Sequence, residues 1–129
     1  MIRYHREHVW VKVEEASAWI GLTFYAQAHL GEIVYLDLPP AGKRLTMDRP
    51  FGEIESAKTT SELTAPVSGT VLESNLELEA HPGLINESPL EKGWIAKVGL
   101  ADAAELDLLM DHEAYQAYLE AENQEKSQE

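Results

Sequence analysis

The sequence predicts a single domain that is mostly β, a flattened β-barrel or sandwich completed by a short helix and by C-terminal helices. Short apolar runs bounded by glycine, proline and asparagine recur as far as residue 98, as is typical of many short strands. The apolar spacing becomes helical only from Asp102 onward. With 129 residues and a hydrophobic content of 44%, the chain can fold around one core. We therefore predict one domain over residues 1–120 and a frayed polar tail over residues 121–129.

The predicted strands are apolar residues that alternate with polar ones or that cluster between turn residues. They are residues 9–14, 18–22, 33–38, two strands that flank Lys58, 70–72 and 94–98. The first alternates valine with polar or aromatic residues, so we expect it to be buried on one face. Thr23 is a suitable N-cap and Gly31 a suitable stop, so residues 24–30 are predicted to form the short helix.

The C-terminal part of the chain carries the other helix signals. Asp102 and Glu105 have the spacing of a capping box, and the leucines that follow them supply an apolar stripe. Asp111 is a suitable cap for a second helix, on which Tyr115 and Tyr118 lie at helical spacing. Aromatic residues in this pattern favour packing over ligand binding, so we expect these two to cover the barrel.

Composition argues against several classes of function. The formal net charge of −13, from 23 acidic and 10 basic residues, disfavours binding to nucleic acid or to anionic membrane surfaces. It fits either association with basic partner surfaces or simple solubility of the protein. Since there is no cysteine, neither disulfides nor thiolate catalysis can belong to the chain itself. No apolar stretch approaches the length of a membrane span and no secretion signal opens the chain, so we expect a cytoplasmic protein.

The remaining chemistry-bearing residues predict neither an enzyme nor a metal site. The sequence contains no nucleophile elbow and no phosphate-binding loop. His5 and His8 form a His-x-x-His pair. On a strand this spacing would place the two side chains on opposite faces, which is wrong for a shared metal ion.

Lys58 lies in the segment that best suits the display of one side chain. Ile54 and Leu63 are apolar anchors on either side, and small or polar residues fill the stretch between them. This pattern predicts two short strands joined by a tight turn. The turn has no glycine, so we expect a rather rigid tip from which the lysine projects. An exposed amine of this kind is an attachment point, because acylation removes its charge and adds a long arm.

Several separated segments, in the same order along the chain, resemble the glycine cleavage H-protein family. From the N-terminal side they are Ile20-Gly21-Leu22-Thr23, Leu30-Gly31-Glu32-Ile33-Val34-Tyr35, Glu55-Ser56-Ala57-Lys58, Ala65-Pro66-Val67-Ser68-Gly69, Leu84-Ile85-Asn86 and Gly93-Trp94. The resemblance implies a fold of the lipoyl/biotinyl-carrier type in which Lys58 carries lipoate through an amide bond. It also implies that Glu55, Ser56 and Glu62 are recognition points for a lipoate-attaching enzyme. Biotin carriers typically place their lysine between two methionines, which this chain does not.

The resemblance implies a non-catalytic carrier whose arm shuttles a reaction intermediate between enzymes, as the H-protein does with the aminomethyl group in glycine cleavage. The implied partners are glycine decarboxylase, aminomethyltransferase and dihydrolipoamide dehydrogenase. Tethering would raise the effective concentration of the arm's end at each of them. An unmodified interaction module is the alternative of another class, and the mass of the intact protein would distinguish the two.

Two positions depart from the family pattern. The family's His-Glu-Trp is His8-Val9-Trp10 here, and its Thr-Asp is Thr23-Phe24. In the family, the glutamate of the first motif helps to hold the amine of the loaded arm in a cleft, and valine has no charge to offer an ammonium. The candidates for an arm cleft in this chain are His8, Val9 and Glu7, with Glu62 as a second acidic residue. The missing carboxylate leaves an alternative open, an H-protein-like lipoate-binding protein that carries sulfur intermediates for a heterodisulfide-reductase-like complex in sulfur oxidation.

Overall fold

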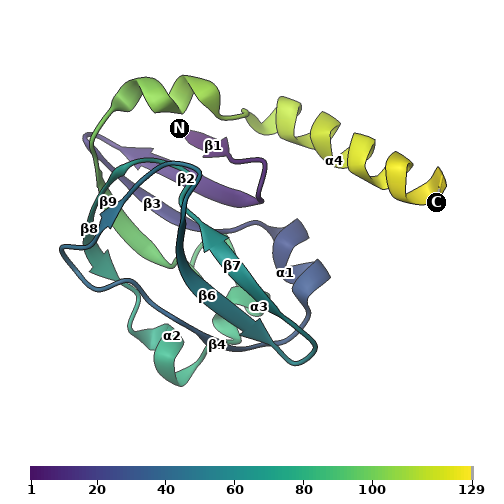
Figure 1. Ribbon diagram of the computed structural model, residues 1–129, viewed down its shortest axis with the longest axis horizontal. Coiled ribbons are helices and arrows are strands. Elements are labelled where there is room, and N and C mark those ends of the chain that lie inside the picture. The colour runs from purple at the N-terminus through teal and green to yellow at the C-terminus, as the bar shows by residue number, and fades with distance from the viewer. Residues whose placement is uncertain (129) are drawn as a thin grey trace.

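The computed structural model describes residues 1–128, the last five of them as helix backbone alone. The strands are β1 (Ile2–Tyr4), β2 (Val9–Glu14), β3 (Ser17–Leu22), β4 (Ile33–Leu36), β5 (Arg44–Leu45), β6 (Pro50–Ser56), β7 (Thr60–Thr64), β8 (Gly69–Ser74) and β9 (Ala96–Leu100). The helices are α1 (Phe24–Leu30), α2 (Glu77–Ala80), α3 (Leu84–Glu87), the 3₁₀ helix η1 (Ala103–Leu108) and α4 (His112–Gln128). Figure 1 shows the strands gathered into one body, from which α4 extends away.

The strands form two sheets. The larger has the order β1-β2-β3-β9-β8-β5, and the smaller has the order β4-β6-β7. All pairings between these strands are antiparallel. The predicted mostly β fold is therefore confirmed, as a flattened sandwich whose sheets do not close into a barrel. The hairpin β6–β7, which carries Lys58, belongs to the smaller sheet.

One hydrophobic core joins the two sheets to the short helices. It includes Val9, Val11, Ile20, Leu22, Ile33, Ile54, Leu63, Val71, Leu78, Ile85, Ile95, Val98 and Leu106. β2 is buried mainly on one face, as predicted, since Val9 and Val11 are buried while Lys12 and Glu14 on the other face are exposed. The exception is Trp10, which is 1% exposed and packs with Tyr4 and Tyr115 of α4 in a second cluster.

The segment that leads into α4 differs from the predicted capping box. Asp102 caps the 3₁₀ helix η1, with its Oδ1 accepting a hydrogen bond from Ala104 N at 3.0 Å. The Glu105 carboxylate accepts hydrogen bonds from both N and Oγ of Ser68, each at 2.7 Å. Because Glu105 makes this long-range contact, it does not reach back to the cap, and it ties the C-terminal segment to the turn before β8.

Helix α4 begins as the sequence predicts. Asp111 Oδ1 accepts a hydrogen bond from Ala114 N at 2.8 Å, and the ring of Tyr115 stacks on Tyr4 with 4.5 Å between centroids. The helix runs on through residues 121–128, where we predicted a frayed tail, and the fraying itself stays a prediction. Glu129 lies outside the described residues. Within residues 1–128, no helix is long and apolar enough to cross a membrane.

Candidate functional site

Lys58 is exposed in the turn between β6 and β7, as predicted. A hydrogen bond from Ser56 N to Thr59 O at 2.8 Å closes the turn. The Ser56 hydroxyl accepts bonds from the backbone N of Lys58 at 3.3 Å and of Thr59 at 3.1 Å, and donates to Thr59 O at 3.2 Å. Because one hydroxyl serves three backbone groups, the turn keeps its shape without glycine. Ser56, which is 6% exposed, thus holds the turn that displays Lys58.

The hairpin tip leans on the segment that joins α1 to β4. Ala57 N donates a hydrogen bond to Glu32 O at 2.9 Å. Gly31 ends α1 in a left-handed conformation with φ of 83°, which glycine adopts without strain. A Cβ built on Gly31 would lie 3.5 Å from Cε of Lys58, so the lysine stem passes over this glycine. The end of α1 therefore forms the floor beneath the root of the lysine side chain.

Asn86 of α3 holds that floor in place. Its Nδ2 donates hydrogen bonds to Gly31 O at 2.8 Å and to Gln27 Oε1 at 3.0 Å, and its Oδ1 accepts one from Ile33 N at 2.9 Å. Gln27 and Ile33 are both buried. One amide side chain therefore connects the end of α1 and the start of β4, directly beneath the Lys58 turn.

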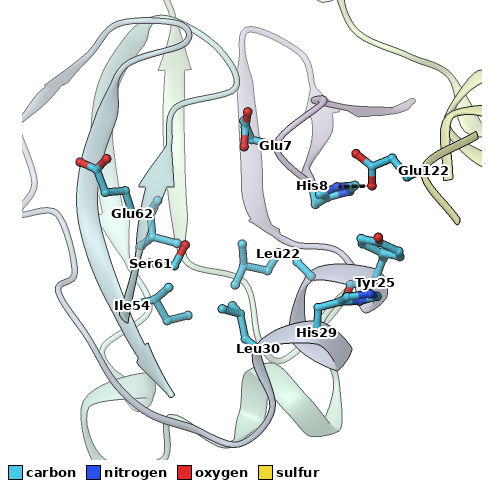
Figure 2. Close-up of a pocket in the computed structure, with 12 residues that line it drawn as sticks. Glu7, His8, Leu22, Tyr25, His29, Leu30, Ile54, Ser61, Glu62 and Glu122 are labelled. Atoms are coloured by element: carbon cyan, nitrogen blue, oxygen red, sulfur yellow. Dashed lines mark hydrogen bonds and ion pairs between the residues drawn. The ribbon is translucent and has the colours of Figure 1, made fainter. Parts of the chain in front are cut away.

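A pocket of about 520 Å³ lies beside the hairpin. It is lined by Glu7, His8, Leu22, Tyr25, Ala26, His29, Leu30, Ile54, Ser61, Glu62, Leu63 and Glu122. Figure 2 shows the hairpin as one wall and α1, His8 and Glu122 as the other, with leucine side chains between them. Leu30 lies next to Gly31 in the chain, so the root of the lysine and the pocket share the end of α1.

Two of the predicted acidic residues take different positions at this pocket. Glu7 reaches it from the turn between β1 and β2. Glu62 belongs to β7, and Figure 2 shows its carboxylate turned to the outer face while the neighbouring Ser61 faces inward. Leu63, the next residue, is buried in the core. On that outer face Glu62 pairs in register with Glu53, and both are exposed. Glu55 is also exposed and does not line the pocket.

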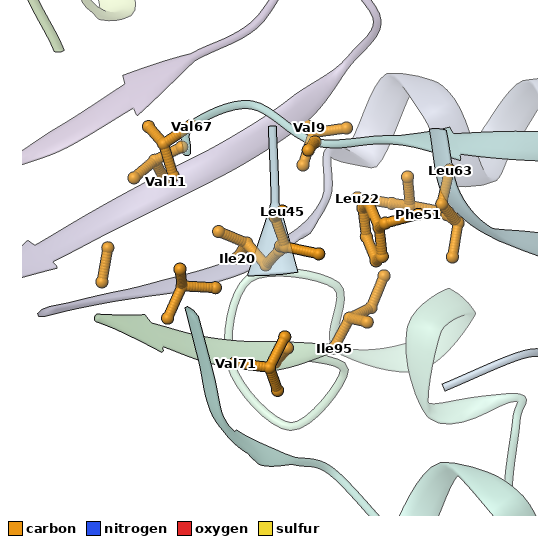
Figure 3. Close-up of a cluster of buried hydrophobic side chains, with 14 of the residues drawn as sticks. Val9, Val11, Ile20, Leu22, Leu45, Phe51, Leu63, Val67, Val71 and Ile95 are labelled. Carbon is orange, nitrogen blue, oxygen red and sulfur yellow. The ribbon is translucent and has the colours of Figure 1, made fainter. Parts of the chain in front are cut away.

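Val9 does not line the pocket. Its side chain is 2% exposed and packs in the main core, as Figure 3 shows. The prediction that Val9 belongs to the arm cleft is therefore corrected. Phe24, the other departure from the family pattern, is 67% exposed at the start of α1. Neither side chain contributes to the lining of this pocket.

His5 and His8 lie in the turn between β1 and β2, so the strand geometry that we assumed for them is wrong. His8 N donates to His5 O at 2.9 Å, and His8 has φ of 64°, a left-handed conformation that puts its ring over the pocket. His5 is 1% exposed, and its Nδ1 accepts from Glu7 N at 3.0 Å while its Nε2 donates to Asp48 Oδ1 at 2.6 Å. The hydrogen bond from His5 lowers the pKa of Asp48.

With both ring nitrogens engaged, His5 offers no lone pair to a metal ion. Among the residues that the structure describes, no group of three or more His, Asp or Glu side chains is arranged to hold a metal ion.

A chain of hydrogen bonds runs behind the pocket from α1 to α4. His8 Nε2 lies 3.3 Å from Glu122 Oε2, and His8 Nδ1 lies 2.8 Å from the Tyr115 hydroxyl. That hydroxyl lies 2.8 Å from Oγ1 of Thr23, which caps α1 by accepting from Ala26 N at 3.2 Å. Because a carboxylate only accepts, the neutral His8 ring donates to Glu122 through Nε2, and its Nδ1 is left as an acceptor. The Tyr115 hydroxyl therefore donates to His8 Nδ1, and the Thr23 hydroxyl donates to the Tyr115 oxygen.

Two pKa shifts are consistent with this direction of donation. Burial lowers the pKa of His8, against the pull of the Glu122 and Glu7 carboxylates, which favours the neutral ring. Burial raises the pKa of Tyr115 to about 12, so its hydroxyl keeps the proton that it donates. The sequence did not reveal Glu122, Tyr25 or His29 as pocket residues, because their helices carry no local signal that points them here.

Comparisons with known proteins identify the family. The family model described as glycine cleavage H-protein matches residues 2–122. The chain belongs to the glycine cleavage H-protein family. It is 53% identical over 116 residues to the glycine cleavage system H protein of Brevibacillus brevis, covering 90% of this chain and 92% of that protein. It is 46% identical over 122 residues to glycine cleavage system H protein 2, mitochondrial, of Arabidopsis thaliana, covering 95% of this chain and 78% of that one.

A solved structure supports the same family. The crystal structure of a glycine cleavage system H protein from Mycobacterium marinum is similar with a TM-score of 0.83 at 26% identity, covering 95% of this chain and 96% of that chain. The family predicted from the sequence is thus confirmed, and nothing in these comparisons supports the sulfur-oxidation alternative. The Lys58 hairpin and the pocket, including Glu122, lie within the range that the family model matches.

Proposed function

We propose that the protein is a lipoyl carrier of a glycine cleavage system, with lipoate attached to Lys58 through an amide bond. The observation that carries the proposal is the exposed Lys58 turn, which Ser56 holds rigid beside a pocket, in a chain of the glycine cleavage H-protein family. As a member of this family, the chain is a non-catalytic carrier subunit. The pocket and the hairpin serve the arm, and the chemistry of the reaction belongs to partner enzymes.

The residues around Lys58 are compatible with an acyl arm. The lysine is exposed and its stem passes over Gly31, which leaves the amine accessible to a lipoate-attaching enzyme. The pocket combines an apolar wall that includes Leu22, Leu30 and Ile54 with acidic groups at its rim. This combination suits a hydrocarbon arm with a cationic end. When attached, the lipoyl group supplies a dithiolane that accepts the aminomethyl group and passes it on.

The outer face of the hairpin is the proposed recognition surface for the lipoate-attaching enzyme. Glu53 and Glu55 of β6 and Glu62 of β7 all extend from it into solvent, on either side of the Lys58 turn. An acidic frame of this kind attracts a basic active-site rim and raises the rate of encounter at low salt. Ser56 contributes through the shape of the turn, because its hydroxyl is used within the chain.

The proposed partners in turnover are glycine decarboxylase, aminomethyltransferase and dihydrolipoamide dehydrogenase. The formal net charge of −13 suits repeated, reversible association with basic clefts on several enzymes. Leu22, Leu30 and Leu63 give the pocket an apolar lining, which would shelter the arm's end from water in transit between these enzymes.

The first test is attachment. Co-expression with a lipoate ligase and lipoate should add one lipoyl group, seen as a single mass increment of the intact protein, and peptide mapping should place it on Lys58. Lys58→Arg should abolish the increment because arginine cannot be acylated in this way, whereas Lys92→Arg, at another exposed lysine, should leave it unchanged. An adduct that survives Lys58→Arg would refute the assignment, and no adduct on the unmutated chain would favour an unmodified interaction module.

The second test concerns the pathway. The lipoylated protein is offered to purified glycine decarboxylase and aminomethyltransferase, with glycine as the substrate. Loading of the arm and turnover, measured by intact mass and by release of carbon dioxide, are the expected results. A lipoylated chain that neither enzyme accepts would refute the role in glycine cleavage while leaving attachment at Lys58 intact.

A further inference from the structure

The inner acidic side of the pocket comes from the two ends of the chain. Val9 lies in the core and the Glu62 carboxylate turns outward, so neither supplies charge to the inner part of the pocket. Glu7 reaches the pocket from the turn that precedes β2, and Glu122 reaches it from α4. Figure 2 shows these two on the same side of the pocket, one on each side of His8.

Glu122 is held at the rim of the pocket by its contact with His8. Its Oε2 lies 3.3 Å from His8 Nε2, and only 28% of its side chain is exposed. His8 is itself fixed by the Tyr115 hydroxyl at 2.8 Å and by a turn in which its backbone N donates to His5 O at 2.9 Å. The Glu122 carboxylate is therefore held at the pocket beside the His8 ring.

The helix that carries Glu122 is anchored close to it. Tyr115 stacks on Tyr4 with an interplanar angle of 3°, and the Tyr118 hydroxyl donates to Arg6 O at 3.0 Å. Tyr118 and Glu122 are four residues apart in α4 and therefore lie on one face of the helix. This face is turned to the body of the protein, so the position of Glu122 is set by packing and not by the polar end of the helix.

We propose that Glu122, assisted by Glu7, holds the ammonium of the arm's cargo in this pocket and so takes the role of the carboxylate that Val9 lacks. The proposal rests on the proposed function. An ammonium that enters the pocket meets an apolar wall from Leu22 and Leu30, where an unpaired charge is unfavourable. The partly buried Glu122 carboxylate is the acceptor that the geometry places there, next to a His8 ring that burial keeps neutral.

The test compares three lipoylated variants, Glu122→Gln, Glu7→Gln and Glu120→Gln, after loading with glycine and glycine decarboxylase. Glu120 is exposed on α4 and does not line the pocket, so it is the matched control for charge and helix position. The loss of the cargo is followed by intact mass after removal of the enzyme. Glu122→Gln should lose the cargo about tenfold faster than the unmutated protein, because a tenfold change in rate corresponds to the loss of one hydrogen bond to a charged group. Glu7→Gln should also lose the cargo faster, but by a smaller factor. Glu120→Gln should behave as the unmutated protein.

A second measurement does not depend on turnover. Loading should change the NMR signals of the His8 ring in the unmutated protein, because the ammonium then shares Glu122 with His8. This change should be absent in Glu122→Gln and present in Glu120→Gln. A loaded Glu122→Gln variant that keeps its cargo as long as Glu120→Gln, or that shows the full change at His8, would overturn the proposal. Failure of the unmutated protein to be lipoylated or loaded would instead overturn the proposed function.

Discussion

Replacing Asn86 with alanine should weaken both the fold and the display of Lys58. The side chain makes three hydrogen bonds, to Gly31 O, to Gln27 Oε1 and from Ile33 N. At about 1 kcal/mol for each lost bond, the variant should be about 3 kcal/mol less stable. That is a large share of the roughly 5–15 kcal/mol typical of a folded domain, and it corresponds to a melting temperature lower by about 10 °C.

Urea denaturation followed by circular dichroism measures the loss of stability. The dependence of the free energy of unfolding on urea concentration should not change, because the folded state stays compact. The second effect is functional. Asn86 supports Gly31 and the neighbouring segment on which the Ala57 backbone rests, so Lys58 should be lipoylated more slowly even at temperatures where the variant is folded. The initial rate of lipoylation by a ligase, followed by intact mass, measures it.

Asn75 offers a matched control. It is 5% exposed, and its Nδ2 donates to Lys92 O at 2.8 Å and to Trp94 O at 2.9 Å, away from the Lys58 turn. Asn75→Ala should therefore cost about 2 kcal/mol and leave the rate of lipoylation of folded protein unchanged. If Asn86→Ala costs less than Asn75→Ala, or if both variants slow lipoylation equally, then Asn86 does not hold the floor beneath Lys58 as we reason.

Two further predictions concern the pocket and the turn. The folded-state pKa of His8 lies below the ordinary 6.5, so between the two values the unfolded chain binds more protons, and the free energy of unfolding should fall as the pH drops through that window. An NMR titration of the His8 ring that gave a pKa above 6.5 would contradict this. Ser56→Ala should lower the free energy of unfolding, measured by urea denaturation, by about 1–2 kcal/mol, since Thr59 O and two backbone N–H groups lose their hydrogen-bond partner. A variant as stable as the unmutated protein would show that the turn does not depend on the Ser56 hydroxyl.

The elements that the sequence predicted well are those with local signals. Thr23 caps α1 and Gly31 ends it because a side-chain oxygen and a left-handed glycine satisfy the helix ends within a few residues. The Lys58 hairpin was equally visible, since its apolar anchors and its polar tip lie within ten residues of one another. These features need no knowledge of the rest of the chain.

The features that the sequence did not predict depend on distant partners. β1 is only three residues long, and it exists because β2 and Met110 supply its hydrogen bonds. The left-handed turn at His8 is stabilised by the buried contact of His5 with Asp48, 43 residues away. Glu122 is one of many acidic residues in a polar stretch, and only the packing of α4 distinguishes it from Glu120.

The place of Glu122 in α4 has a practical consequence for protein engineering. Gln128 lies six positions further along the helix, a rise of about 9 Å, so anything joined beyond Gln128 begins within a short reach of the pocket. A purification tag or a fluorescent fusion at that end would obstruct the access of partner enzymes to the arm. Truncating the helix before residue 122 would remove a side chain of the pocket. Labels for binding studies are better placed on an edge strand of the larger sheet, such as β5, than at the end of α4.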